Sequence, residues 1–446
     1  MSHYKPYPAY KDSGVEWIGR LPEHWDISKI ARLGPLAKAN GGSKQDNVDS
    51  GVPCIRYGDL YTTHEYFIRG SRSYIGLDKL GEYTPIRYGD ALFAASGETF
   101  EDIGRSAVNL LREEACCGGD VIVFRLTTNL DPLFLGYALD SMSSKAQKAL
   151  MGKGYTVVHI YADQLRELIV ALPPATEQEA IGTALNCETA RIDALIAKKT
   201  RFIELLKEKR SALITHAVTK GLDPNVKMKD SGVEWIGEVP EHWGVPPVKI
   251  CYEARLGKML QPNAVTQADI LVPYHRAQTV QWERIDDLAV DRMWASRADI
   301  ERFSVDIGDL LICEGGDVCR AAIVRALVGQ NLIFQNSLHR VRPKGRHGVE
   351  WVLRLMQHLR SSGWIDVLCN KNTIVHFTSE KLGALACPLP PASEQSAIVA
   401  FLDRETARID ALVGKTQRSI DLLKERRSAF ITAAVTGQID LRGEIA

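Results

Sequence analysis

The strongest constraint on this chain is that its sequence occurs twice. A nine-residue run, KDSGVEWIG, begins at Lys11 and again at Lys229, and the PEHW motif that follows it recurs at the same offset of 218 residues. An eight-residue run, ETARIDAL, begins at Glu188 and returns at Glu405, 217 residues later. Identical runs of this length at one period do not arise by chance, and two copies fill the 446 residues. We therefore interpret the chain as a tandem duplication.

The two copies differ most between these shared segments. Residues 30–150 and 250–370 align only faintly, whereas the flanking frames are nearly identical. Uniform drift after duplication would not spare the frames and erase the inserts, but selection of each insert for its own target would. The pattern favours a constant frame that carries two variable domains, and simple duplication with drift is the alternative.

A long helix is predicted in each copy. After Pro173 and Pro174, which break a helix, the first extends from Glu177 to about Val218, with Thr176 as its N-cap. Apolar residues recur at alternating steps of four and three residues, the spacing of a coiled-coil seam. The predicted seam consists of Ile181, Leu185, Ile192, Leu195, Phe202, Leu206 and Leu213 in the first copy and of Ile398, Leu402, Ile409, Leu412, Leu423 and Phe430 in the second. Each helix would be ~60 Å long at 1.5 Å per residue.

A helix of this kind cannot bury its apolar stripe alone, and its duplicate is the obvious partner. Because a whole insert joins the two helices, they can pair antiparallel; the alternative is that each helix packs only on its own insert. The frame that follows the first helix also stands at the N-terminus, where it would follow the second helix if the chain were a ring. Both termini are therefore expected at the same end of the helix pair. The repeated tryptophans of the frames, Trp17 and Trp25 with Trp235 and Trp243, are expected to be packing residues that seat each frame on its insert.

Composition and charge are those of an ordinary globular protein. Charged residues make up 25% and hydrophobic residues 45% of the chain. Lys plus Arg and Asp plus Glu are each 55, so net charge neither favours nor excludes a nucleic-acid partner. No run of about 18 apolar residues occurs, which predicts a cytoplasmic protein with no membrane partner. The nine cysteines form no Cys-x-x-Cys pair, so neither a disulfide framework nor a metal site is expected.

Each insert is predicted to be an α+β domain, because short β-type runs punctuated by turns precede a helical pattern. Two loops stand out in each: residues 96–105 and 152–156 in the first insert, and residues 314–320 and 370–373 in the second. Glycine lets a backbone approach a ligand closely, and Arg or Lys side chains reach phosphates or guanine edges. The candidate DNA-contacting residues are Arg56, Ser96, Gly97, Arg105, Lys153, Tyr155, Thr156, Arg276, Gly315, Gly316, Arg320, Lys371, Asn372 and Thr373.

Motifs of the common nucleic-acid enzymes are missing. None of the three Pro-Pro pairs has the preceding Asp, Asn or Ser and the following aromatic residue that an amino-methyltransferase needs. The sequence contains no Gly-x-x-x-x-Gly-Lys-Ser/Thr phosphate loop, no Glu-x-Lys nuclease half-motif and no His-Glu-x-x-His site. The chain is therefore predicted to be non-catalytic, and an enzyme with an unrecognised site in the inserts is a competing hypothesis.

The duplicated frames resemble those of the specificity (S) subunits of type I restriction-modification systems, the HsdS family. The resemblance rests on KDSGVEWIG with PEHW, on LPP-x-x-EQ, and on ETARIDAL followed by LLKE and RSALIT-x-AVT, which the second copy varies as RSAFITAAVT. It extends over nearly the full length. The loops SGETFEDIGR and EGGDVCRA depart from the family's Gly-x-Ile-Gly-Lys form in being more acidic.

The resemblance implies an α+β chain in which two α/β target recognition domains are separated by a long antiparallel two-helix coiled coil, a tandem repeat with pseudo-two-fold symmetry. The implied segments are a first recognition domain (1–170), a first conserved spacer helix (171–221), a second recognition domain (222–387) and a second conserved spacer helix (388–446). Each recognition domain would read one half of a bipartite DNA site, and the helices would fix the gap between the halves.

The partners that the resemblance implies are double-stranded DNA, two modification (methyltransferase) subunits and two restriction (translocase and nuclease) subunits. Catalysis, S-adenosylmethionine, ATP and Mg would belong to those subunits, so neither a cofactor nor a metal is expected in this chain. The alternative function is a structural coiled-coil scaffold that tethers two protein-binding domains without DNA.

Overall fold

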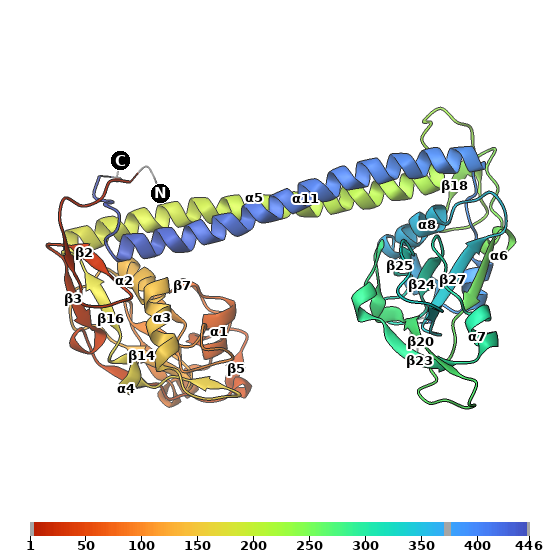
Figure 1. Ribbon diagram of the computed structural model, residues 1–446. Coiled ribbons are helices and arrows are strands. Elements are labelled where there is room, and N and C mark those ends of the chain that lie inside the picture. Colours follow the sequence, from red (N-terminus) through yellow and green to blue (C-terminus); the bar gives the residue numbers. More distant parts are fainter. Residues whose placement is uncertain (1–3, 370–375, 444–446) are drawn as a thin grey trace. The chain divides into compact units, whose positions relative to one another are not determined.

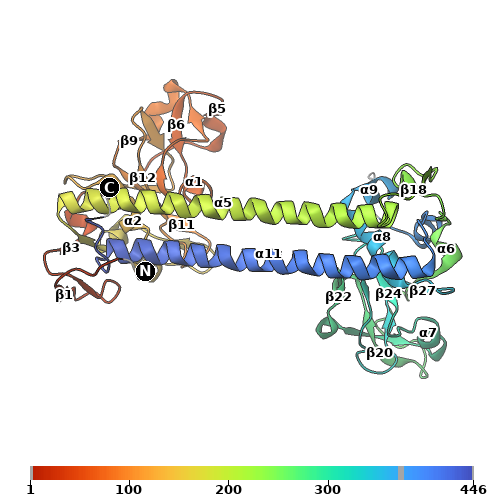
Figure 2. The same ribbon diagram turned by 90° about the horizontal axis from the view of Figure 1, so that it is seen from above.

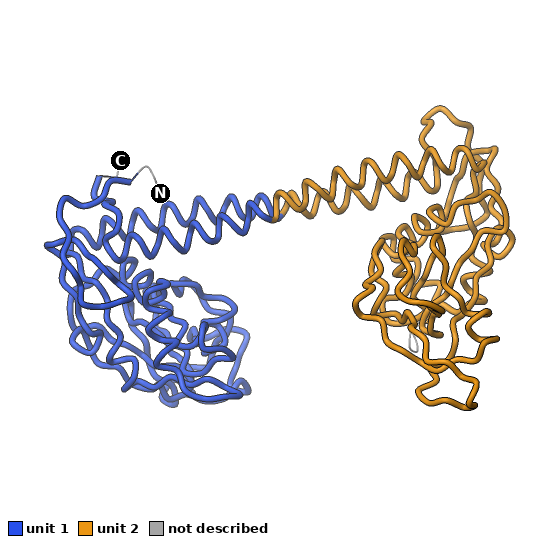
Figure 3. Tube along the Cα trace, viewed as in Figure 1, with its two compact units in different colours: residues 1–200, 418–446 blue, residues 201–417 orange. Residues whose placement is uncertain are grey.

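The computed structural model describes residues 4–369 and 376–443. The chain forms two compact units: unit 1 comprises residues 1–200 and 418–446, and unit 2 comprises residues 201–417 (Figure 3). Each unit contains one insert and half of each of two long helices, α5 (Ala175–Lys220) and α11 (Ala392–Val435). The segments predicted from the sequence separate each long helix from the insert that precedes it. Each compact unit instead combines one insert with part of both helices, and the boundary between the units lies near the middle of each helix.

The two long helices are paired antiparallel. Within each unit the segments of α5 and α11 lie side by side (Figures 1 and 2). In unit 1, Nε of Arg427 lies 2.9 Å from a carboxylate oxygen of Asp193; in unit 2, Nε of Arg210 lies 3.2 Å from one of Asp410. The later position on α5 thus pairs with the earlier position on α11, which confirms the predicted direction. Since α5 begins at Ala175, Thr176 lies inside its first turn, and its predicted role as N-cap is wrong.

Buried isoleucines follow both helices at a regular spacing of eleven residues. They are Ile181, Ile192, Ile203 and Ile214 on α5, and Ile398, Ile409, Ile420 and Ile431 on α11, all at most 8% exposed. An eleven-residue repeat has 3.67 residues per turn, close to the 3.6 of a straight α-helix, whereas the predicted spacing of four and three has 3.5. The predicted seam positions Leu195, Phe202 and Leu412 are therefore left 45–48% exposed.

The insert of unit 1 is built on two five-stranded sheets. Most neighbouring strands are antiparallel, but β7 and β12 are parallel, as are β6 and β13. The first sheet has the order β4 (Leu36–Lys38), β14 (Val121–Phe124), β10 (Ala91–Ala94), β12 (Ser106–Asn109), β7 (Tyr66–Ile68). The second has the order β5 (Asn47–Val48), β8 (Tyr74–Ile75), β6 (Val52–Ile55), β13 (Ala115–Cys117), β9 (Thr84–Ile86). The helices α1 (Tyr57–Thr62), α2 (Pro132–Leu139) and α3 (Met142–Met151) complete the insert.

The insert of unit 2 has a smaller set of sheets. A four-stranded antiparallel sheet has the order β19 (Tyr252–Leu256), β27 (Leu338–Pro343), β24 (Leu310–Cys313), β25 (Ala321–Ile323). A three-stranded sheet has the order β23 (Asp291–Ala295), β20 (Ile270–His275), β26 (Ile333–Phe334). Helix α8 (Val349–Ser361) packs with the four-stranded sheet, and most of its residues are buried. Mixed sheets and helices in both inserts, with the two paired helices, confirm the predicted α+β class.

The repeated KDSGVEWIG run forms the same β-hairpin in both copies. In unit 1 it pairs β1 (Tyr10–Asp12) with β2 (Arg20–Pro22), and in unit 2 it pairs β17 (Met228–Asp230) with β18 (Glu238–Pro240). The glycine that ends each run, Gly19 or Gly237, has a φ of 67° or 69°. A residue with a Cβ adopts this left-handed conformation only with strain, which explains the glycine at this turn.

The PEHW motif holds each frame to the first turn of a long helix. The indole nitrogen of Trp25 donates a 2.5 Å hydrogen bond to Glu177 of α5, and that of Trp243 donates a 3.1 Å bond to Glu394 of α11. Both indoles are fully buried and Trp235 is 8% exposed, as expected for packing residues, whereas Trp17 is 37% exposed.

The two ends of the chain meet in unit 1, as predicted. The backbone amide of Asp440 donates a 2.9 Å hydrogen bond to the carbonyl of Lys5. Among the described residues, no helix is long and apolar enough to cross a membrane.

Candidate nucleic-acid interface

In each insert the first candidate loop is hydrogen-bonded to the segment that follows the second one. In unit 1, β11 (Ser96–Gly97) of the first loop pairs antiparallel with β15 (Val158–His159), which follows the second. The amide of Ile160 then donates a 3.0 Å bond to the carbonyl of Ala95. In unit 2 the amide of Phe377 donates a 2.8 Å bond to the carbonyl of Glu314. Two inserts of different sequence therefore share a backbone hydrogen bond between the first loop and the segment after the second.

The second loop of unit 1 is a tight turn that presents an aromatic ring to solvent. Its ends are closed by two backbone hydrogen bonds between Lys153 and His159, of 2.9 and 2.7 Å. Gly154 has a φ of +126°, and a Cβ there would lie 2.1 Å from the carbonyl oxygen of Val157, so only glycine fits. Tyr155 is completely exposed at the tip. An exposed ring on a constrained turn can contact base edges or a thymine methyl group.

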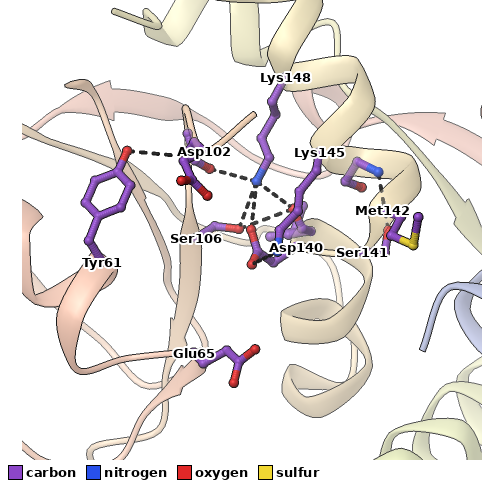
Figure 4. A network of polar contacts seen from close by, with 12 residues as sticks. Tyr61, Glu65, Asp102, Ser106, Asp140, Ser141, Met142, Lys145 and Lys148 are labelled. Carbon is purple, nitrogen blue, oxygen red and sulfur yellow. Dashed lines mark hydrogen bonds and ion pairs between the residues drawn. The ribbon is translucent and has the colours of Figure 1, made fainter. Parts of the chain in front are cut away.

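The first loop of unit 1 is fastened at both of its ends. The hydroxyl of Tyr61 on α1 lies 2.9 Å from the carbonyl oxygen of Ser96 and 3.2 Å from that of Asp102 (Figure 4). Together with Gly97 and Glu98, these residues line a hollow of about 500 Å³ beside the loop. The hydroxyl of Ser96 also lies 2.9 Å from Nδ1 of His159 on β15.

A buried lysine holds the far end of this loop. The ammonium of Lys148 on α3 donates hydrogen bonds to the carbonyls of Gly104, at 2.7 Å, and Leu139, at 3.0 Å, and lies 3.0 Å from a carboxylate oxygen of Asp140 (Figure 4). Lys148 is fully buried, and loss of hydration lowers the pKa of its ammonium although Asp140 opposes this. Sequence reasoning missed this residue.

Three of the four candidate arginines bind groups of the protein itself. Arg56 donates bonds of 2.9 and 2.6 Å to the carbonyl of Ser43 and the side chain of Asn47. Arg276, which precedes a short helix after β20 as Arg56 precedes α1 after β6, forms a 2.9 Å ion pair with Asp291. Arg320 donates a 2.8 Å bond to the carbonyl of Ala277. Arg105 is half-buried, and among the described residues its Nε has no hydrogen-bond partner, as is also true of the Nε atoms of the other three.

The remaining candidates differ in accessibility. Lys153 and Thr156 are exposed in the second loop of unit 1. Gly315 is partly buried against the His376 ring, and Gly316 is exposed with a φ of 71°. Lys371, Asn372 and Thr373 lie outside the described residues. The loop residues of unit 1 are thus brought together, and those of unit 2 are described on one side only.

Exposed aromatic residues around the loops of unit 1 were not among the candidates. Tyr57 on α1, Phe100 in the first loop and Tyr161 after β15 are 44%, 44% and 57% exposed. The sequence offered a weak signal for them, since each lies beside a turn and outside a regular apolar period. Across the described residues, no group of three or more His, Cys, Asp and Glu side chains is arranged to hold a metal ion.

The known proteins that this chain resembles are specificity subunits of type I restriction enzymes. A family model described as the type I restriction modification DNA specificity domain matches residues 22–205. A putative type I restriction enzyme specificity subunit (MjaX) from Methanocaldococcus jannaschii is 22% identical over 443 residues, covering 95% of this chain and 96% of the relative. The EcoKI specificity subunit of Escherichia coli K12 is 21% identical over 436 residues, covering 94% and 90%.

A solved structure shares the fold. One chain of a structure described as the basis of complex assembly and conformational transition of the type I R-M system aligns with a TM-score of 0.70 and 16% identity, covering 94% of this chain and 99% of that one. The chain is thus similar over nearly its full length to type I restriction-modification specificity subunits, and its residues 22–205 match their DNA specificity domain.

Proposed function

We propose that this chain is the DNA-recognition subunit of a type I restriction-modification complex and that each unit reads one half of a bipartite site. The observation that carries the proposal is the backbone hydrogen bond that recurs at the first loop of both inserts. Two inserts whose sequences align only faintly are held by nearly identical frames, and in each the segment after the second loop donates a backbone hydrogen bond at the first loop. A protein that recognises an asymmetric two-part DNA site needs loops of different sequence that are held in the same way in its two units. The family match does not favour the alternative, a scaffold without DNA.

The paired helices would set the gap between the half-sites and dock two modification subunits. Both helices continue from one unit into the other, so their length would govern the separation of the two readers. The half-exposed Leu195 and its repeat Leu412 offer equivalent apolar positions on the two helices for two equivalent partners. The restriction subunits would join this assembly.

Catalysis and its cofactors would reside in the partners. S-adenosylmethionine would be bound by the modification subunits, and ATP and Mg by the restriction subunits. The residues of this chain would then act only by binding and orienting DNA. Arg and Lys side chains and backbone amides of the loops supply phosphate and base contacts, and exposed tyrosines supply apolar ones.

The test is an exchange of inserts in the assembled complex. Residues 30–150 would be replaced by the corresponding residues of another family member, and methylated adenines would be mapped across the genome of a host that carries the system. We expect one half-site to change while the other half and the gap stay the same. A change in both halves, or methylation without any sequence preference, would rule the proposal out.

A further inference from the structure

A groove in unit 1 lies between the insert and the long helices. Its insert side is the segment Thr63–Arg72, which includes β7, and its helix side includes Asn186 and Asp193 of α5 and Arg427 of α11. Its volume is about 680 Å³. We call it the β7 groove.

Two arginines give the β7 groove an uncompensated positive charge. Arg69 and Arg72 are exposed, and among the residues that the structure describes no carboxylate forms an ion pair with either. The two carboxylates of the groove, Glu65 and Asp193, both form 2.9 Å ion pairs with Arg427. Three guanidinium groups therefore face two carboxylates, and the surplus charge lies on the insert side.

Arg69 is held in place before any ligand binds. Its Nη2 donates a 2.8 Å hydrogen bond to the side chain of Asn186, and its guanidinium carbon lies 5.2 Å from the centre of the Phe67 ring. A guanidinium fixed on one edge and one face keeps its other N–H groups for a further acceptor. Because less rotamer entropy is lost on binding, such an arginine suits bidentate contacts with phosphate oxygens.

The β7 groove and the hollow beside the first loop are lined by adjacent residues of the chain. Helix α1 lines the hollow beside the first loop with Tyr57, Tyr61 and Thr62, and the groove starts at the next residue, Thr63. A duplex strand that leaves the reading loops along α1 would therefore pass over Arg69 and Arg72.

We propose that the β7 groove binds the phosphodiester backbone of duplex DNA beside the half-site read by unit 1, with Arg69 and Arg72 as the phosphate contacts. This inference rests on the proposed function and adds to it a sequence-independent contact between the recognition loops and α5. Contacts with phosphates position a protein on the duplex and carry no direct sequence information.

The test compares two arginine variants in the assembled complex with its modification subunits. The first is the double variant Arg69→Ala/Arg72→Ala. The control is Arg112→Ala, because Arg112 is also exposed, also stacks on an aromatic ring (Tyr88, 5.3 Å) and lies outside the groove. Affinity would be measured by fluorescence anisotropy from 50 to 200 mM salt on a duplex with the mapped site and on one without it.

Loss of two phosphate contacts is expected to reduce the slope of log affinity against log salt by about two. Affinity at 0.1 M salt should fall on the order of tenfold for each contact, equally on both duplexes. The control should leave slope and affinity unchanged. An unchanged slope in the double variant, a loss confined to the duplex with the site, or failure to assemble with the modification subunits would each overturn the inference. If the wild-type complex itself showed no site preference and no salt dependence, the proposed function would fail instead.

Discussion

Arg427 and Asp193 form an ion pair across the two long helices in unit 1, and their repeats, Arg210 and Asp410, form the same pair in unit 2. Both repeats lie 217 residues away, the offset of the ETARIDAL run. Each arginine also contacts a glutamate of its insert: Arg427 lies 2.9 Å from Glu65, and Arg210 lies 3.2 Å from Glu283. The contact between the two long helices and the insert therefore dates from before the duplication, and both copies have kept it.

Replacement of Arg427 by alanine is expected to destabilise unit 1. Its side chain is only 12% exposed, and its loss leaves the carboxylates of Glu65 and Asp193 without their cation. Because both carboxylates are about half exposed, we expect a moderate cost of about 1–2 kcal/mol, measured by denaturant unfolding. Arg191→Ala is the control, since its ion pair with Glu188 on the same helix is largely exposed and should cost under ~0.5 kcal/mol. Equal costs would contradict the assignment.

Replacement of Lys148 by methionine is expected to impair one half-site only. Methionine fills a similar volume but leaves the carbonyl of Gly104 without its donor, so the first loop is no longer fixed. We expect about tenfold weaker binding, ~1.4 kcal/mol, when the half-site of unit 1 is intact, and normal discrimination at the other half-site. Lys145→Met is the matched control, because Lys145 also binds Asp140 but is partly exposed and does not contact the loop. A variant that lost preference at both half-sites would show a global defect instead.

Lys148 also illustrates what the sequence could not reveal. It lies in an amphipathic pattern, SSKAQKAL, in which a lysine normally marks the exposed face of a helix. Its burial depends on carbonyls supplied by Gly104 and Leu139, which only the folded insert brings together. The antiparallel helices, in contrast, could be predicted. The repeat and the length of the apolar stripe can both be recognised in the sequence without knowledge of the fold.

The helix seam shows an intermediate case. The residues Ile181, Ile192, Ile398 and Ile409 were predicted and are buried, but Ile203, Ile214, Ile420 and Ile431 were not predicted. A spacing of three and four residues fits the first turns of either pattern. The two periods differ by about 0.17 residue per turn, so predicted positions such as Leu195 and Leu412 fall off the buried face, while Leu206 and Phe430 still lie on it.

Stability is expected to fall as the pH drops below about 6.5, mainly in unit 2. Burial lowers the pKa of His275, His339 and His358 there, and in the described part of unit 1 it lowers that of His64 alone. A histidine whose folded pKa lies below its unfolded value of about 6.5 is neutral in the fold, while the unfolded chain binds the proton. Stability is therefore full above the unfolded pKa and declines below it, by up to ~1.4 kcal/mol per pH unit for each histidine.

The variant His358→Gln isolates one of these contributions. Nδ1 of His358 lies 2.9 Å from the hydroxyl of Thr215 on α5, and the side chain is buried. We expect the free energy of unfolding, measured between pH 5 and 7, to depend less steeply on pH in this variant. The control is His216→Gln, because His216 is exposed, and this variant should leave the pH dependence of the free energy of unfolding unchanged. If the slope of His358→Gln matched that of the wild type, the imidazole would not be neutral in the fold.

The eleven-residue period of the helices leads to a prediction about the gap between half-sites. The boundary between the units lies between Ile192 and Ile203 on α5 and between Ile409 and Ile420 on α11. Two extra periods in each helix at these places, 22 residues, would preserve the buried face and add about 33 Å at 1.5 Å per residue. One turn of B-DNA is about 34–36 Å, or 10–10.5 base pairs. Both readers would therefore face the same side of the duplex as before, at a gap about ten base pairs longer.

A single extra period in each helix is the informative comparison. It preserves the buried face equally well but adds only about 16 Å, or five base pairs, which is half a turn of the duplex. The second half-site would then face away from its reader. We expect methylation mapping to show a bipartite site with the longer gap for the 22-residue insertion and little specific methylation for the 11-residue insertion. If both variants kept the wild-type gap, the helices would not set the spacing between the two half-sites.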